Sequence, residues 1–162
     1  MAQPVKKEIK KEHKVKKIKS YKPSKPKKKH KEYGTSKLEE KFAKEFLEKL
    51  GIDYVYQFKA ESIGRYFDFY VKSNNIIIEI NGGYWHSDPR LYEGKELNPT
   101  QKRNKRVDEL KKKWALAHGI PIIYIWEKDI HENPSYVMKI LKENLESSAK
   151  KVKIEEEKKK RH

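Results

Sequence analysis

Two carboxylates and one histidine lie close together along the chain, in segments otherwise rich in apolar and aromatic residues. Asp68 belongs to the stretch RYFDFY, Glu79 follows three isoleucines, and His86 comes directly after an aromatic pair. An ionised carboxylate among apolar neighbours loses its hydration unless a cation or hydrogen bonds compensate for it. Carboxylates and backbone carbonyls are oxygen ligands for Mg²⁺, and an imidazole beside them can move protons. This combination predicts metal-assisted hydrolysis of a phosphodiester.

The spacing of two predicted strands indicates that both carboxylates share one face of a hairpin. If Asn74 and Asn75 form a tight turn, Asp68 faces Asn81, and Glu79 lies diagonally at about 7–8 Å. Two carboxylates that converge at the end of a buried strand repel each other unless a cation or a proton lies between them. The alternative is a carboxylate that faces solvent at the end of the sheet.

Three further residues could complete such a site. His86 could activate water or protonate a leaving oxygen, although a lone histidine is more often structural. Glu39 falls inside the apolar arc of a helix that starts at Ser36, where it either reaches the site or caps the helix. Asp108 borders the buried face of a later helix and could orient the imidazole through its second nitrogen.

Aromatic and basic side chains indicate a nucleic-acid partner. Gly82 and Gly83 allow a sharp turn of the backbone, and the aromatic pair that follows can stack on bases or wedge between base steps. Lysine-rich runs attract phosphate backbones without reading their sequence. The residues that we expect to contact duplex DNA are Tyr84, Trp85, Lys105, Arg106, Lys27, Lys28 and Lys29.

Basic charge is concentrated at the two ends of the chain. The 162 residues include 40 Lys plus Arg and 24 Asp plus Glu, for a formal net charge of +16. Residues 1–32 carry +11 and residues 149–162 carry +4, whereas residues 33–148 are nearly neutral and hold 17 of the 18 aromatic residues. We therefore predict a folded domain at 33–148 between a disordered, Lys-rich tail and a second basic tail. The alternative for the tails is a solubilising segment without a specific role.

Composition also excludes several classes of protein. The chain has no Cys, which removes disulfides, thiolate-based zinc sites and a cysteine nucleophile. No apolar run reaches the roughly 18 residues that span a bilayer, and the start MAQPVKKEIKK lacks the apolar stretch of a secretory signal. We expect a soluble intracellular protein of the host cytoplasm, associated with the nucleoid, or of the nucleus in a eukaryotic host. No membrane and no small-molecule cofactor are expected.

The predicted elements follow the order helix, three strands, helix, strand, helix. Helices are expected at 36–50, 99–118 and 133–145, and strands at 52–59, 65–71, 76–80 and 120–126. The first strand should present one dominant apolar face, and the second helix should bury Val107, Leu110 and Trp114. The fold class is α/β, with a small mixed β-sheet flanked by helices.

Taken in order, these residues resemble the very-short-patch repair (Vsr) endonucleases and the related phage homing endonucleases of the EDxHD type, within the PD-(D/E)xK nuclease superfamily. The resemblance covers about residues 36–129. Its elements are a Ser-x-x-Glu helix start before a Gly-ended helix, an Asp on a strand, an aromatic-Trp-His segment and a later helical Asp. In this sequence they are Ser36 to Glu39, Gly51, Asp68, Gly82 to His86, Asp108, Gly119 and Trp126-Glu127.

The resemblance implies a restriction-endonuclease-like fold and an endodeoxyribonuclease. Asp68 would bind Mg²⁺, helped by the backbone carbonyl of Ile80, and Glu39 would complete the site through water. His86 would be the catalytic histidine, supported by Asp108. Tyr84 and Trp85 match the aromatic residues that these enzymes insert into DNA.

Two departures from the family leave alternatives open. The absence of Cys removes the structural zinc of Vsr proteins, which favours the zinc-less homing relatives. Glu79-Ile80-Asn81 also resembles the (D/E)xK element with Asn in place of Lys, so Glu79 is an alternative or additional metal ligand. The leading hypothesis is a Mg²⁺-dependent DNA endonuclease. The alternatives are an inactive nucleic-acid-binding protein on the same fold and a repair nuclease for mismatched or branched DNA.

Overall fold

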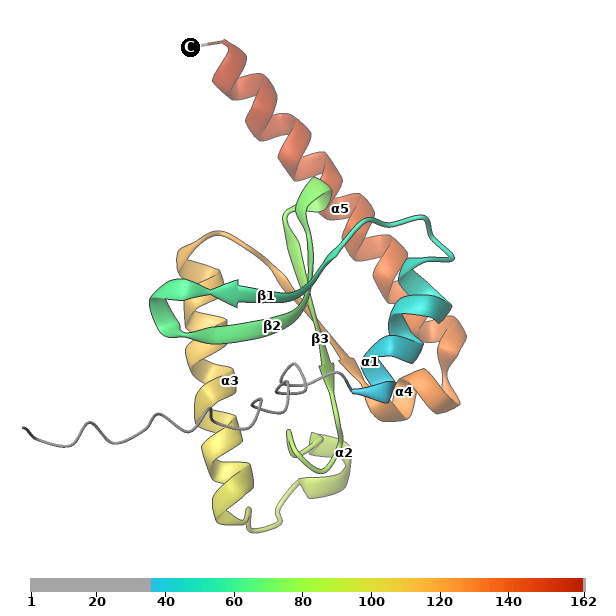
Figure 1. Ribbon diagram of the computed structural model, residues 1–162, viewed down its shortest axis with the longest axis vertical. Helices are drawn as coiled ribbons and strands as arrows, with labels where there is room; N and C mark the ends of the chain where they lie inside the picture. Colours follow the sequence, from blue (N-terminus) through green and yellow to red (C-terminus); the bar gives the residue numbers. More distant parts are fainter. Residues whose placement is uncertain (1–35, 162) are drawn as a thin grey trace, which may run out of the picture. The chain divides into compact units, whose positions relative to one another are not determined.

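The computed structural model describes residues 36–161, which form a four-stranded mixed β-sheet with helices on both faces (Figure 1). The sheet order is β1-β2-β3-β4, and the strands are Val55–Ala60, Arg65–Val71, Ile76–Asn81 and Ile122–Trp126. Consecutive hairpins make the first three strands antiparallel, whereas β4 returns parallel to β3 after a helical crossover. The predicted α/β class with a small mixed sheet is confirmed.

Five α-helices surround the sheet within the described residues: α1 (Lys37–Phe42), α2 (Pro89–Tyr92), α3 (Pro99–Ala117), α4 (Glu127–Glu132) and α5 (Pro134–Lys160). A π-helical turn, Ala43–Leu47, continues α1. The Ser36 side chain accepts the Glu39 N–H at 3.2 Å and caps α1. A reciprocal capping box of Asn98 and Gln101 starts α3. The helices predicted from residues 36 and 99 are therefore confirmed.

Two apolar clusters hold these layers together. The larger one lies between the sheet and α1, α4 and α5, and the smaller one between the sheet and α3 (Figure 1). Every residue of β3 is buried, because this strand is covered on both faces. The side chains along β3 are therefore largely shielded from solvent, and the site is built at the end of this strand.

The first strand does not have the single apolar face that its alternation predicts. Tyr56 packs against the larger cluster, whereas Phe58 packs against the smaller one on the opposite side of the sheet. Gln57 lies between them with φ +51°, in the left-handed region. The facing strand changes sides in the same way, since Phe69 is in the larger cluster and Phe67 in the smaller one. At Gln57 the side chains of the hairpin therefore switch from one side of the sheet to the other, which a period-two pattern does not reveal.

The buried side of α3 also differs from the prediction. Trp114 packs against the smaller cluster as predicted, but Leu110 is 40% exposed, and the fully buried residues of this helix are Gln101 and Ala115. Lys111 is also turned inwards, with its side chain 13% exposed. This side of α3 covers the acidic end of the sheet, so polar residues occupy positions where amphipathic patterning expects apolar ones.

The C-terminal segment, predicted as a second basic tail, is helical. Helix α5 runs through Lys160, so the boundary expected at 148/149 falls inside it. Ser148 is its last buried residue, and the exposed remainder is rich in Lys and Glu, which favour helix without tertiary packing. The predicted tail at 1–32 lies outside the described residues. Across 36–161, no helix combines the length and apolar character needed to cross a membrane.

Candidate active site

The two central carboxylates lie closer together than expected. The register of β2 against β3, extended by one residue, places Asp68 opposite Glu79. The prediction that Asp68 faces Asn81, with Glu79 diagonal to it, is wrong by two residues. The turn is longer than a two-residue hairpin loop, because residues 72–74 form a 3-10 turn and Asn75 takes a left-handed conformation. The two carboxyl groups still lie side by side, since that of Glu79 is in direct contact with that of Asp68.

Asp68 is held by the backbone of the neighbouring strand, and Glu79 is held beside it. The Ile80 N–H donates to Asp68 Oδ2 at 2.7 Å. Glu79 is 5% exposed, and its carboxyl group is in hydrogen-bonding contact with that of Asp68. Burial and then the negative charge of Asp68 raise the pKa of Glu79 well above its usual range. The pair therefore favours a shared proton or a cation.

Lys111 of α3 supplies positive charge at this place, and the sequence reasoning missed it. Its ammonium forms an ion pair with Glu79 Oε1 and lies 4.8 Å from the centroid of the Phe67 ring. Lys111 follows Asp108 by three residues, so the two share one face of the helix. That spacing was the available signal.

Glu39 reaches the same site from the first helix. Its Oε2 accepts a hydrogen bond from the Tyr56 hydroxyl at 2.6 Å. Burial and then the negative charge of Asp68 raise the pKa of Glu39 to about 7. Since its N–H also bonds to Ser36, Glu39 both belongs to the capped helix start and contributes a carboxylate to the acidic cluster.

A histidine and an aspartate form the second part of the site. His86 Nδ1 lies 2.8 Å from Asp108 Oδ2, and the side chains are 27% and 30% exposed. Because an ionised carboxylate only accepts hydrogen bonds, Nδ1 carries the proton, and in the neutral ring Nε2 is the nitrogen that can accept one. Burial and then the charges of Glu79 and Asp108 raise the pKa of Tyr124 to about 12. Tyr124 is therefore close enough to both parts of the site for their negative charges to act on its hydroxyl.

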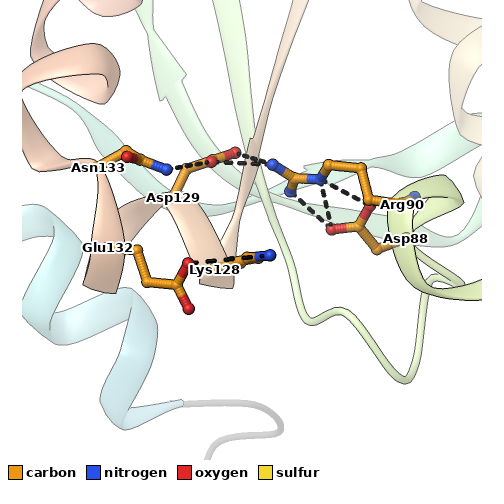
Figure 2. Close-up of polar contacts among 6 residues, drawn as sticks. All are labelled: Asp88, Arg90, Lys128, Asp129, Glu132 and Asn133. Carbon is orange, nitrogen blue, oxygen red and sulfur yellow. Dashed lines mark hydrogen bonds and ion pairs between the residues drawn. The ribbon is translucent and has the colours of Figure 1, made fainter.

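The loop that carries His86 is anchored by an arginine clamp (Figure 2). Arg90 Nη2 lies 2.6 Å from Asp88 Oδ2, and Arg90 Nη1 lies 2.9 Å from Asp129 Oδ1 in α4. The two carboxylates are 0% and 6% exposed. Asn133 Nδ2 completes the group with a 3.3 Å hydrogen bond to Asp129. The hydrogen bonds from Arg90 lower the pKa of Asp88.

The predicted DNA-contacting aromatic residues project from this loop. Tyr84 and Trp85 are 50% and 56% exposed, and their ring centroids are 5.0 Å apart in an edge-to-face arrangement. Gln101 Nε2 donates to the Tyr84 carbonyl at 2.9 Å, and Asn104 Nδ2 donates to the Trp85 carbonyl at 3.0 Å. Helix α3 thus fixes the backbone of the aromatic pair while leaving the rings accessible.

The predicted basic contacts are divided between described and undescribed parts of the chain. Lys105 and Arg106 are exposed on α3, and Lys105 lines the same cleft as His86. Lys27, Lys28 and Lys29 lie outside the described residues.

The acidic cluster has the donor chemistry for Mg²⁺. Glu39, Asp68 and Glu79 offer hard oxygen atoms, and their mutual repulsion and burial favour a bound cation. The Ile80 side chain is in the apolar core, so this residue has only backbone groups to offer. Within 36–161, no three acidic or histidine side chains already stand as a ready-made metal cluster. Lys111 provides the counter-charge to Glu79 in this conformation.

No protein-family model matches this chain, and no curated protein is significantly similar to it. Functional inference therefore depends on the residues themselves and on their geometry.

Proposed function

We propose that this protein is a Mg²⁺-dependent DNA endonuclease with a restriction-endonuclease-like fold, similar to the Vsr and EDxHD homing enzymes. One observation carries the proposal: the buried Asp68–Glu79 pair and the His86–Asp108 hydrogen bond lie in one region, near enough to Tyr124 that the charges of Glu79 and Asp108 both raise its pKa. A structural role alone would not require such an accumulation of carboxylates beside an oriented imidazole.

Each side chain has a distinct role in this proposal. Asp68 and Glu79, with Glu39, would hold Mg²⁺, which supplies positive charge against the phosphodiester in the transition state. His86 Nε2 accepts a proton from the attacking water, and Asp108 keeps the imidazole in the required tautomer. The Asp68–Ile80 hydrogen bond fixes the first carboxylate in place.

Duplex DNA is the substrate that the surface of the same region favours. The exposed Lys105 and Arg106 side chains can neutralise phosphates, and the projecting Tyr84 and Trp85 rings can insert between base steps. The net charge of +16 adds long-range attraction to the polyanion.

A DNA-binding protein without catalytic activity is the second candidate, and the Lys111–Glu79 ion pair favours it. An ammonium that neutralises Glu79 already removes part of the repulsion that a metal would relieve. In that case, duplex binding would depend on salt and basic residues but not on Mg²⁺ or Asp68.

Conversion of supercoiled plasmid to nicked or linear DNA tests the proposal. Wild-type protein should convert the plasmid with Mg²⁺ and not with EDTA. Asp68→Asn and His86→Ala should each lower the rate at least 100-fold at equal DNA binding. Matched controls are Asp53→Asn and His131→Ala, which change exposed residues outside the site and should retain wild-type rates.

Two results would separate the candidates. Binding without cleavage across plasmid, mismatched and branched substrates would reject the nuclease and leave the binding protein. Cleavage that survives both Asp68→Asn and His86→Ala would reject this site. If cleavage does require both residues, competition between perfect and mismatched duplexes will distinguish a homing-type enzyme from a repair nuclease.

A further inference from the structure

A cleft of about 650 Å³ opens at the end of the parallel strand pair. Its floor includes Asn81 and Trp126, the last residues of β3 and β4, together with Tyr124. The loop after β3 forms one wall, and α3 forms the other. Ligands commonly bind beyond the carboxyl ends of parallel strands, and the volume lies within the range of small-ligand pockets, about 300–1,000 Å³.

The lining of this cleft suits a planar neutral group better than an isolated anion. Three aromatic side chains contribute π faces or edges: Tyr92, Tyr124 and Trp126. Three ammonium groups are matched by three carboxylates: Lys95, Lys105 and Lys112 against Glu93, Asp108 and Glu109. A cleft that had to hold only a phosphate would gain nothing from the carboxylates. A nucleotide, by contrast, can place its base on the aromatic surface and its phosphate at an exposed lysine.

The aromatic residues that could unstack such a base directly precede a residue that lines the cleft. Tyr84 and Trp85 project into solvent from a backbone fixed by α3, and His86, the next residue, lines the cleft. An aromatic wedge can fill the space that a displaced base leaves in the duplex. The wedge and the proposed general base are therefore consecutive residues of one short segment, and the general base lines the cleft.

We propose that the cleft is a nucleotide pocket that receives a base turned out of the DNA stack. Tyr124 and Trp126 provide the stacking surface, and Lys95 or Lys105 contacts the phosphate. The choice of DNA as the polymer rests on the proposed function, but the affinity of the cleft for a nucleotide does not.

Titration with mononucleotides tests the pocket by itself. Deoxynucleoside 5′-monophosphates should bind to the full chain in a saturable way, followed by NMR or calorimetry, and deoxyribose 5-phosphate should bind at least tenfold more weakly. Tyr124→Ala should weaken nucleotide binding about tenfold, the loss of one base–aromatic stack. Tyr124→Leu repeats the test with bulk retained. The matched control Tyr136→Ala, at a residue 53% exposed on α5 and outside the cleft, should bind as wild type does. Equal affinity for the sugar phosphate and the nucleotides would overturn the pocket.

Photo-cross-linking tests the extruded base in duplex DNA without knowledge of a recognition sequence. Duplexes with 5-iododeoxyuridine in place of thymidine are irradiated with the protein in Ca²⁺, and the linked residues are identified by mass spectrometry. Links to Tyr124 or Trp126 are expected, whereas links confined to Tyr84 and Trp85 would show wedging without extrusion and reject the inference. Plasmid cleavage is scored separately. If the protein cleaves the plasmid but its cleft binds no nucleotide, only the pocket is rejected. If the cleft binds nucleotides but the protein never cleaves, only the nuclease is rejected.

Discussion

Replacement of Arg90 by alanine should destabilise the protein far more than loss of an ordinary surface charge. Arg90 makes five hydrogen bonds to the carboxylates of Asp88 and Asp129, with donor–acceptor distances between 2.6 and 3.1 Å. Among the described residues, Arg90 is the only cation that forms an ion pair with this buried acidic pair, and Arg90→Ala removes it. The loop that carries His86 then loses this ion-pair connection to α4.

The size of the effect follows from burial. Removal of one partner from a buried ion pair costs about 3–5 kcal/mol, because the remaining charge is left uncompensated. The Arg90 side chain is 42% exposed, so water can replace part of its interaction, and we expect a loss of about 2–4 kcal/mol. Small domains have a free energy of unfolding of about 5–15 kcal/mol. The urea midpoint should therefore fall by about 1–2 M at an m-value of about 2 kcal/mol/M.

The effect should depend on pH in a defined direction. The clamp lowers the pKa of Asp88, so the interaction stabilises the fold above the unfolded-state pKa of about 3.9 and is lost as pH falls through the lower folded-state pKa. The difference between wild type and Arg90→Ala should thus be complete at pH 7 and shrink below about pH 4.

Urea unfolding followed by tryptophan fluorescence measures these differences. Lys128→Ala is the matched control, because its ion pair with Glu132 spans 3.8 Å between exposed side chains (Figure 2) and should contribute less than about 1 kcal/mol. Asp88→Asn combined with Asp129→Asn should recover part of the stability lost in Arg90→Ala. A loss for Arg90→Ala no larger than for Lys128→Ala, or one unchanged at pH 3, would refute the reasoning.

Three further changes probe the surrounding elements. Asp108→Asn should lower single-turnover cleavage about 10–100-fold without weakening DNA binding, since the amide no longer holds the His86 tautomer; an equal loss of affinity would contradict a purely orienting role. Ser87 has φ +54° and a buried hydroxyl that finds no hydrogen-bond partner among the described residues, so Ser87→Gly should raise the free energy of unfolding by about 1–2 kcal/mol. Ser87→Ala should gain less because it keeps the backbone strain, and urea curves that rank the two variants otherwise would exclude this account. Gln101→Leu should cost about 1–3 kcal/mol, because Gln101 is 2% exposed and bonds to the Tyr84 carbonyl; unchanged stability would show that this contact is dispensable.

Local signals were sufficient for the elements that chain chemistry controls. The Ser36 cap and the Gly119 end of α3 act within a few residues, so the predicted helix starts and the end of α3 lie close to their observed positions, whereas the end of α5 was missed. The unbroken isoleucine run likewise identified the strand that is buried on both faces.

The partners within the site were only partly predictable. The His86–Asp108 contact was expected from the position of Asp108 on the helix, and the structure has it at 2.8 Å. Lys111 was missed because apolar patterning takes an inward lysine for a surface residue, and Arg90 was missed because neither of its partners signals burial in the sequence. Both errors have one cause: hydrophobicity patterns place charged residues at the surface, whereas an ion pair allows a charged side chain to be buried.

The sequence alone therefore determined which side chains can do chemistry and which local elements carry them, since caps, turns and periodicity act over a few residues. The tertiary structure decided which of those side chains meet. A longer turn shifted the register so that Asp68 lies opposite Glu79, and the left-handed Gln57 turned the faces of the hairpin. The packing of α3 then brought Lys111 onto Glu79 across 32 residues of chain. Such contacts depend on the backbone geometry of whole strands, turns and helices, and a pattern of a few residues does not determine it.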